Sequence, residues 1–268
     1  MEPWIAAGAL WLAFLCLVVR LRYGLTLSQR CAAIKFKRRD AVSPHALFSY
    51  LLSANLAVLE HDDFNQLGSA HSARRVRELL ERYWRIHSSE DLHRVLRQLL
   101  ARLGANSPEE QAAYDAWRDR QPIDTETYAA LLDVCVFLSV DAGVIKPREI
   151  GERHLRMMAW DIQQAAYILR LGFALGYVTR EFAESNLGRL QREARIHYTS
   201  WNDYSISSLV GRGLRARIDL FDPGDWQRIA QSHGVLTAAH SPIAQAAPWG
   251  RPGFWLEVQR KAVWPQEG

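Results

Sequence analysis

Apolar positions recur every three or four residues over most of the chain, a period that is typical of amphipathic α-helices. Segments with this pattern follow one another from residue 44 to about residue 221. No convincing strand-like alternation precedes the last quarter of the sequence. The pattern therefore predicts an all-α, multi-helix globular body. The expected helices are Pro44 to Glu60, Ala73 to Ile86, one from Ser88 or Ser89 to Gly104, one that opens with the capping box Ser107 to Glu110, Asp124 to Val140, one from Pro147 into the stretch that starts at Ala159, and two that begin after Thr179 and Ser200.

The stretch from Ala159 to Arg212 contains a buried-looking carboxylate. Asp161 falls in a helical stripe whose other members are apolar or glycine, namely Met158, Ala165, Ile168 and Gly172. Because an unpaired buried charge is costly, we expect Asp161 to find a hydrogen-bond donor or a cation. Arg212 is the candidate, since its flanking glycines Gly211 and Gly213 let the backbone approach closely. Two alternatives stay open: Asp161 faces solvent, or the pair is catalytic rather than a structural clamp.

The N-terminal residues predict a membrane anchor. Pro3 to Val19 is a run of 17 residues without charge, about 25 Å long as a helix. This is the short end of what crosses a bilayer, and Leu21 and Tyr23 can extend it, so we expect a single transmembrane helix within residues 1–23. A cleaved signal peptide fits less well, because a basic leader and a small-residue cleavage site are missing. A buried soluble helix is the remaining alternative.

The charge distribution predicts the orientation of that anchor. Between Arg20 and Arg39 there are seven basic residues and no acidic one: Arg20, Arg22, Arg30, Lys35, Lys37, Arg38 and Arg39. Positive charge stays on the cytoplasmic side of a membrane, which places the C-terminal body in the cytoplasm. Residues 24–43 would form a basic tether, lying on anionic lipid headgroups or acting as a solvated linker.

Composition narrows the class of protein. The chain has 268 residues, of which 49% are hydrophobic, enough for one large domain or two small ones. The net charge of the whole chain is +4, and subtracting the seven basic residues and adding back Glu2 leaves −2 for the body from Asp40 onward. A body that is nearly neutral argues against nucleic-acid binding. Three widely spaced cysteines fit a reducing compartment. We expect a helical domain at residues 44–221 and a C-terminal helix with an extended tail at residues 222–268.

The sequence offers little that indicates catalysis. It contains no glycine-rich phosphate loop, nucleophile elbow or zinc-protease motif, and we expect no metal and no cofactor. His61-Asp62-Asp63 is interpreted as a polar cluster at a helix end. Trp160, Tyr177 and Trp201 either line a small-molecule pocket or wedge helix ends together, and the second interpretation is preferred.

Several short motifs carry a family resemblance. Leu79 to Gly104 combines an aromatic helix end, a hinge and a leucine-rich helix, and it precedes Ala159-Trp160-Asp161, Gly176-Tyr177, Ser200-Trp201 and Gly211-Arg212. In order and spacing they resemble the bacterial "domain of unknown function 1266" family, over a core of about residues 75–215. Two features depart from that pattern: Gln163-Gln164 follows the Trp-Asp pair, and no tryptophan closely follows Gly211-Arg212. The resemblance implies a helical bacterial domain and supplies no activity.

These observations favour a protein-interaction or scaffolding module over an enzyme. The module would be held by one span at a bacterial inner membrane, with the lipid bilayer and a protein as its partners. The alternative is a membrane-tethered enzyme, hydrolytic in character, or an effector, with a site near Asp161, Ser200 and Arg212. Residues proposed as a structural or ligand-binding corner are Trp160, Asp161, Tyr177, Ser200, Trp201, Gly211 and Arg212.

Overall fold

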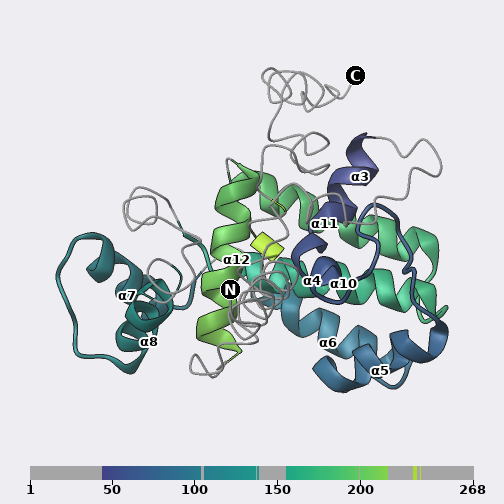
Figure 1. Cartoon of the computed structure of the whole chain (residues 1–268), viewed down its shortest axis with the longest axis horizontal. Coiled ribbons are helices and arrows are strands. Elements are labelled where there is room, and N and C mark those ends of the chain that lie inside the picture. The colour runs from purple at the N-terminus through teal and green to yellow at the C-terminus, as the bar shows by residue number, and fades with distance from the viewer. Residues whose placement is uncertain are drawn as a thin grey trace, which may run out of the picture.

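The computed structural model describes residues 44–103, 106–136, 138, 155–198, 200–216, 232–233 and 236. All regular secondary structure in these residues is helical, as the sequence predicts (Figure 1). The helices are α3 (Pro44–Leu51), α4 (Ala54–Leu59), α5 (Ala73–Trp84), α6 (Ser89–Ala101), α7 (Pro108–Arg118), α8 (Glu126–Val136), α10 (Met158–Ala174), α11 (Arg180–His197) and α12 (Trp201–Arg215).

Some predictions fall outside these residues. The anchor at residues 1–23, the tether at residues 24–43, the start of the helix expected from Pro147 and nearly all of residues 222–268 are not described. In the part of the chain that is described, none of the helices has both the length and the apolar character needed to cross a bilayer.

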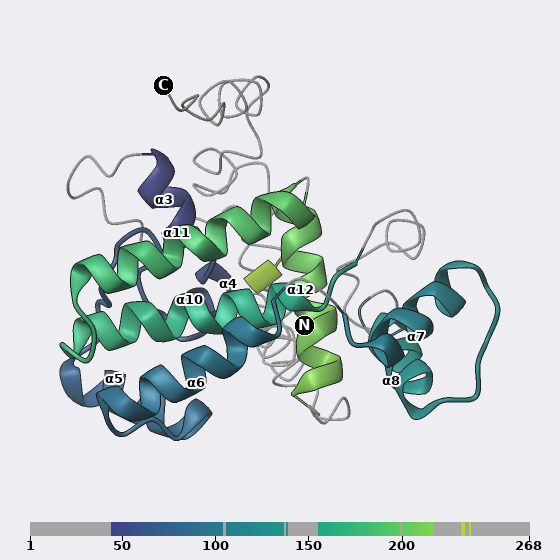
Figure 2. The same cartoon turned by 180° about the vertical axis from the view of Figure 1, so that it is seen from behind.

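Helix α10 lies at the centre of the body. Helices α3, α4, α5, α6, α11 and α12 all pack against it, and Figure 2 shows α11 running alongside it. Of its 17 residues 14 are buried, so this helix is enclosed on nearly every side. Gly172 permits one close approach, because a side chain there would overlap Leu92 of α6. The helix ends just before Gly176, whose φ of +73° suits glycine.

The predicted capping residues set most helix starts. Ser88, not Ser89, caps α6, and Ser107 forms the expected reciprocal capping box with Glu110 on α7. Thr179 and Ser200 cap α11 and α12 by accepting hydrogen bonds from backbone N–H groups. Each cap satisfies a donor that the first helical turn leaves without a partner.

The prediction of one helix from Pro44 to Glu60 is wrong, because the structure has two. Helix α3 ends at Leu51 and α4 begins at Ala54. At the break the Ser53 hydroxyl donates to the carbonyl oxygen of Tyr50 at 3.0 Å and accepts from Arg170 at 2.7 Å. A serine that bonds to nearby backbone competes with helix continuation.

Two hydrophobic clusters form the core. The larger gathers residues from α3 to α6, α10 and α11, and the smaller gathers residues from α7, α8 and α12. Helix α12 contributes to both, through Trp201 and Tyr204 to the larger cluster and through Ile206 and Leu209 to the smaller one. Figures 1 and 2 accordingly show α7 and α8 on the far side of α12 from α5 and α6.

Candidate functional site

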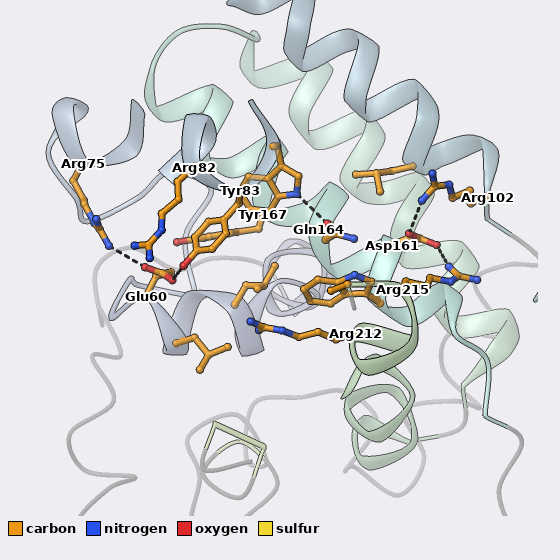
Figure 3. A pocket seen from close by; sticks show the side chains of 16 residues that line it. Glu60, Arg75, Arg82, Tyr83, Arg102, Asp161, Gln164, Tyr167, Arg212 and Arg215 are labelled. Atoms are coloured by element: carbon orange, nitrogen blue, oxygen red, sulfur yellow. Dashed lines mark hydrogen bonds and ion pairs between the residues drawn. The ribbon is translucent and has the colours of Figure 1, made fainter. Parts of the chain in front are cut away.

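A cavity of about 640 Å³ lies where the ends of α4, α6 and α12 meet α5 and the first half of α10 (Figure 3). Its volume falls in the range of pockets that bind small molecules. Five arginines line it, together with two carboxylates, Glu60 and Asp161, which leaves a formal excess of three positive charges. The arginines are Arg75, Arg82, Arg102, Arg212 and Arg215.

Glu60 organises one end of the cavity. It accepts hydrogen bonds from Arg75 at 3.0 Å and from the Tyr83 hydroxyl at 2.7 Å. Burial, and then the hydrogen bond to Glu60, raise the pKa of Tyr83, so this phenol stays protonated and acts as a donor. Arg82 places its guanidinium 5.6 Å from the centre of the Tyr83 ring. Within the described residues, no carboxylate forms an ion pair with Arg82.

Asp161 occupies the other end and is joined to a network of charges. Its Oδ2 accepts a hydrogen bond from Arg215, whose guanidinium also binds both carboxylate oxygens of Glu110 at 2.6 Å. Arg102 lies 3.9 Å from Oδ1 of Asp161. Because Glu110 belongs to the capping box of α7, Arg215 ties three helices together, α7, α10 and α12.

The environment of Asp161 disfavours its charge. Burial raises its pKa from 3.8 to about 6, although Arg215 and Arg102 oppose that shift. For Glu110, burial is outweighed by hydrogen bonds from Arg215 and the Ser107 backbone, and its pKa is lowered. The difference follows from geometry, since Arg215 gives Glu110 two hydrogen bonds and Asp161 one.

Aromatic and amide groups form the middle of the cavity wall. The guanidinium of Arg212 lies over the Trp160 ring, 5.3 Å from its centre. Gln164, one turn after Trp160 on α10, accepts a hydrogen bond from the indole N–H of Trp84 at 2.9 Å. Figure 3 shows Gln164 between the Tyr83 end and Asp161. The cavity thus has a flat aromatic surface as well as cationic groups.

The structure corrects the predicted partner of Asp161. We expected Arg212, but the arginine that binds Asp161 is Arg215, three residues later on the same helix. The prediction that Asp161 is buried and paired is confirmed, and the solvent-facing alternative is wrong. Gly211 allows a close backbone approach as expected, because a Cβ there would lie 2.6 Å from the carbonyl oxygen of Met157.

The other predicted corner residues do not converge on the cavity. Tyr177 lies beyond the opposite end of α10, where its hydroxyl donates to the carbonyl oxygen of His87 at 2.9 Å. Trp201 packs in the core against Tyr204. Ser200 is the N-cap of α12, about 18 Å along that helix from Arg212 at 1.5 Å per residue. Of the three predicted aromatics only Trp160 lines the cavity.

A second polar cluster has a structural role. Asp62 accepts hydrogen bonds from Ser69 and from the backbone of Asp63 and Ala70, which confirms the interpretation of His61-Asp62-Asp63 as a helix-end cluster. Fully buried Arg170 donates to the carbonyl oxygens of Asp63, Gln66 and Gly68. These bonds fix the connection between α4 and α5.

One serine–histidine contact carries no signal in the sequence. The Ser205 hydroxyl and Nδ1 of His233 are 2.7 Å apart, and Asn55 also donates to that hydroxyl. Ser205 has no exposed surface, so this contact belongs to the core.

Among the described residues, no group of three or more His, Cys, Asp or Glu side chains is placed to hold a metal ion.

The arrangement suits the binding of anions. Guanidinium groups bind carboxylates and phosphates through two parallel hydrogen bonds, and an aromatic wall supports flat ligands.

No curated protein and no solved structure matches the chain. Residues 79–249, more than half of the 268, match the model of a family described as "Protein of unknown function (DUF1266)". This match includes every residue of the predicted corner, and the chain therefore belongs to the DUF1266 family of proteins of unknown function.

Proposed function

We propose that the chain is a membrane-anchored binding domain whose helical body takes up an anionic ligand in the arginine-rich cavity. The observation that carries the proposal is the excess of arginines over carboxylates around a cavity of about 640 Å³ that is open to solvent on one side. The C-terminal ends of the helices at the cavity each carry a partial negative charge of about half a unit, and the effect of that charge falls off within the last turn of the helix. The guanidinium groups carry full charges, so the cavity stays attractive to anions.

The proposal keeps the anchor and the orientation that the sequence predicts. The uncharged run Pro3 to Val19 supports attachment to a bilayer, and the seven basic residues that follow support a cytoplasmic body. A protein partner at the membrane stays a prediction. A ligand-binding domain can report its occupancy to such a partner.

Binding is favoured over catalysis for a geometric reason. The enzyme alternative needs Asp161, Ser200 and Arg212 around one substrate, whereas Ser200 and Arg212 lie at opposite ends of α12. Ser200 also uses its hydroxyl to accept a hydrogen bond from the backbone of Asp203 at 3.0 Å. A nucleophile needs a base within hydrogen-bond reach, and this serine caps a helix instead.

The proposal is tested with inorganic pyrophosphate and the full-length chain in detergent, by titration calorimetry. We expect saturable binding to the wild-type protein. Arg82→Ala should weaken it by at least tenfold, because a hydrogen bond to a charged group contributes about 1.5–3 kcal/mol. Arg82 suits this test because it is exposed and lines the cavity.

Arg77→Ala is the matched control. Arg77 is also exposed on α5 but does not line the cavity, so its removal should change the affinity by less than twofold. Equal weakening by both substitutions would mean non-specific attraction to a basic surface. A wild-type protein that binds no pyrophosphate would refute the proposal.

A further inference from the structure

Helix α10 forms one wall of the cavity, and this wall presents a hydrogen-bond acceptor, Asp161, beside a donor, Gln164. Asp161 and Gln164 are three residues apart and therefore neighbours on one face of the helix. The amide of Gln164 has a fixed orientation, because the indole N–H of Trp84 can only donate and so selects Oε1. The NH₂ group of Gln164 is then the part that remains for a ligand.

Asp161 supplies the acceptor. Its side chain has no exposed surface, and none of the described residues donates a hydrogen bond to Oδ1. Arg102 lies 3.9 Å from that oxygen, which is beyond hydrogen-bond distance, and Arg215 binds the other oxygen, Oδ2. Buried carboxylate oxygens without a donor are rare in folded proteins. An N–H group of a ligand would satisfy this oxygen.

Trp160 provides a flat surface next to this pair. It precedes Asp161 in the chain and lines the cavity, and the Arg212 guanidinium lies over its ring. Indole rings and guanidinium planes are the surfaces on which planar nitrogen heterocycles stack. The same cavity has cationic groups at its Glu60 end, where Arg75 and Arg82 lie.

We propose that the anionic ligand is a nucleoside phosphate. Its base packs on the Arg212 guanidinium that lies over Trp160 and exchanges hydrogen bonds with Asp161 and Gln164, and its phosphates bind Arg75 and Arg82. Nucleobases present adjacent donors and acceptors on one edge, which complements an acceptor beside a donor. The glycine-rich phosphate loops are absent from the sequence, and here arginine side chains take their place. This inference rests on the proposed function and specifies the ligand class of that site.

Asp161→Asn gives a test in which two ligands respond in opposite directions. Arg215 can only donate, so it holds the oxygen of the new amide and turns its NH₂ toward the position of Oδ1. The group that faces the base at this position then donates a hydrogen bond where Oδ1 accepted one, so the contact with the base is lost. The substitution also removes a negative charge from the cavity, which favours the binding of a simple anion such as pyrophosphate. We expect about tenfold weaker binding of the nucleoside diphosphate and unchanged or tighter binding of pyrophosphate.

The experiment uses titration calorimetry of the full-length chain in detergent with pyrophosphate and with the diphosphates of adenosine, guanosine, cytidine and uridine. At least one nucleotide should bind ten times more tightly than pyrophosphate. Gln164→Met, which keeps the charge of the cavity, should weaken that nucleotide alone. Gln98→Met, at an exposed position of α6 outside the cavity lining, is its control. Thermal unfolding without ligand checks that each variant is folded.

The outcomes separate this inference from the proposed function. If pyrophosphate binds and none of the four nucleotides binds more tightly, the nucleotide inference is wrong and anion binding stands. The same holds if Asp161→Asn and Gln164→Met change the affinity for both ligands equally. If neither pyrophosphate nor any nucleotide binds, the proposed function fails and this inference fails with it.

Discussion

At the scale of the residue, Asp161 shows how far sequence reasoning reaches. Its place in an apolar stripe predicts burial, and burial predicts an arginine partner; both are confirmed. The identity of that partner was not predictable. Arg212 and Arg215 are about one turn apart on α12, and the packing of α12 on α10 decides which guanidinium reaches Asp161. The sequence did not indicate that the Gln164 amide lines the cavity in a fixed orientation either. That orientation depends on a hydrogen bond from Trp84, which lies 80 residues earlier in the chain.

The raised pKa of Asp161 predicts how stability depends on pH. The folded-state pKa of about 6 exceeds the unfolded value of 3.8, so the folded protein binds a proton first as pH falls. The contribution of Asp161 to the free energy of unfolding therefore increases as pH falls from 7 to 4, by on the order of 3 kcal/mol. Asp161→Asn cannot titrate. Urea unfolding should show that the free energy of unfolding of the wild type rises relative to that of the variant as pH falls from 7 to 4. A difference between the two proteins that does not change with pH would contradict the raised pKa.

Removal of Arg170 should strongly destabilise the fold. Arg170→Met leaves the carbonyl oxygens of Asp63, Gln66 and Gly68 without their donor, the first in a buried and the other two in a partly buried setting. We expect a loss of about 3–5 kcal/mol in the free energy of unfolding, measured by urea denaturation. Arg97→Met, at an exposed position on α6, should change it by less than about 0.5 kcal/mol. Similar losses in the two variants would show that Arg170 does not hold this connection.

At the scale of the element, the helix starts were the most predictable feature. Ser107 and Glu110, Thr179 and Ser200 cap the helices that the sequence assigns to them, because a cap depends on residues close in the chain. The break between α3 and α4 was missed for the opposite reason. The Ser53 hydroxyl bonds to the nearby Tyr50 carbonyl, but it is also held in place by Arg170, 117 residues away. Local patterns cannot report a contact of that kind.

Two helical glycines should respond in opposite ways to alanine. At Gly211 a Cβ would lie 2.6 Å from the Met157 carbonyl oxygen, so α12 and α10 must move apart; at Gly188 of α11 the nearest atom is 3.9 Å away. Gly211→Ala should destabilise by about 1–3 kcal/mol. Gly188→Ala should stabilise by about 0.5–1 kcal/mol, because alanine is the better helix former. Thermal unfolding measures both, and equal effects would refute the close contact.

At the scale of the whole molecule, the cavity depends on how two parts of the body meet. Its lining comes from α4, α5, α6 and α10 on one side and from α12 on the other. The link from Asp161 through Arg215 to Glu110 holds these helices to α7. The sequence predicts the individual helices, but it does not predict that five arginines, from α5, α12 and the C-cap of α6, surround one volume. That grouping is a property of tertiary packing.

The predicted anchor has a direct test in cell fractionation. The full-length chain should sediment with membranes, resist extraction by carbonate and dissolve in detergent. Leu12→Arg places a charge within the uncharged run and should shift the chain to the soluble fraction, since arginine at the centre of a span costs about 2.5–3.5 kcal/mol. Recovery of the wild-type chain in the soluble fraction would refute the anchor.

The central claim is that the arginine-rich cavity holds an anion, and anomalous diffraction from crystals soaked in tungstate tests it most directly. Tungstate is a phosphate-like anion whose scattering identifies its position. The account predicts a peak inside the cavity, within about 3 Å of guanidinium nitrogens of Arg82 or Arg212. Peaks confined to arginines on the outer surface, with none in the cavity, would contradict it.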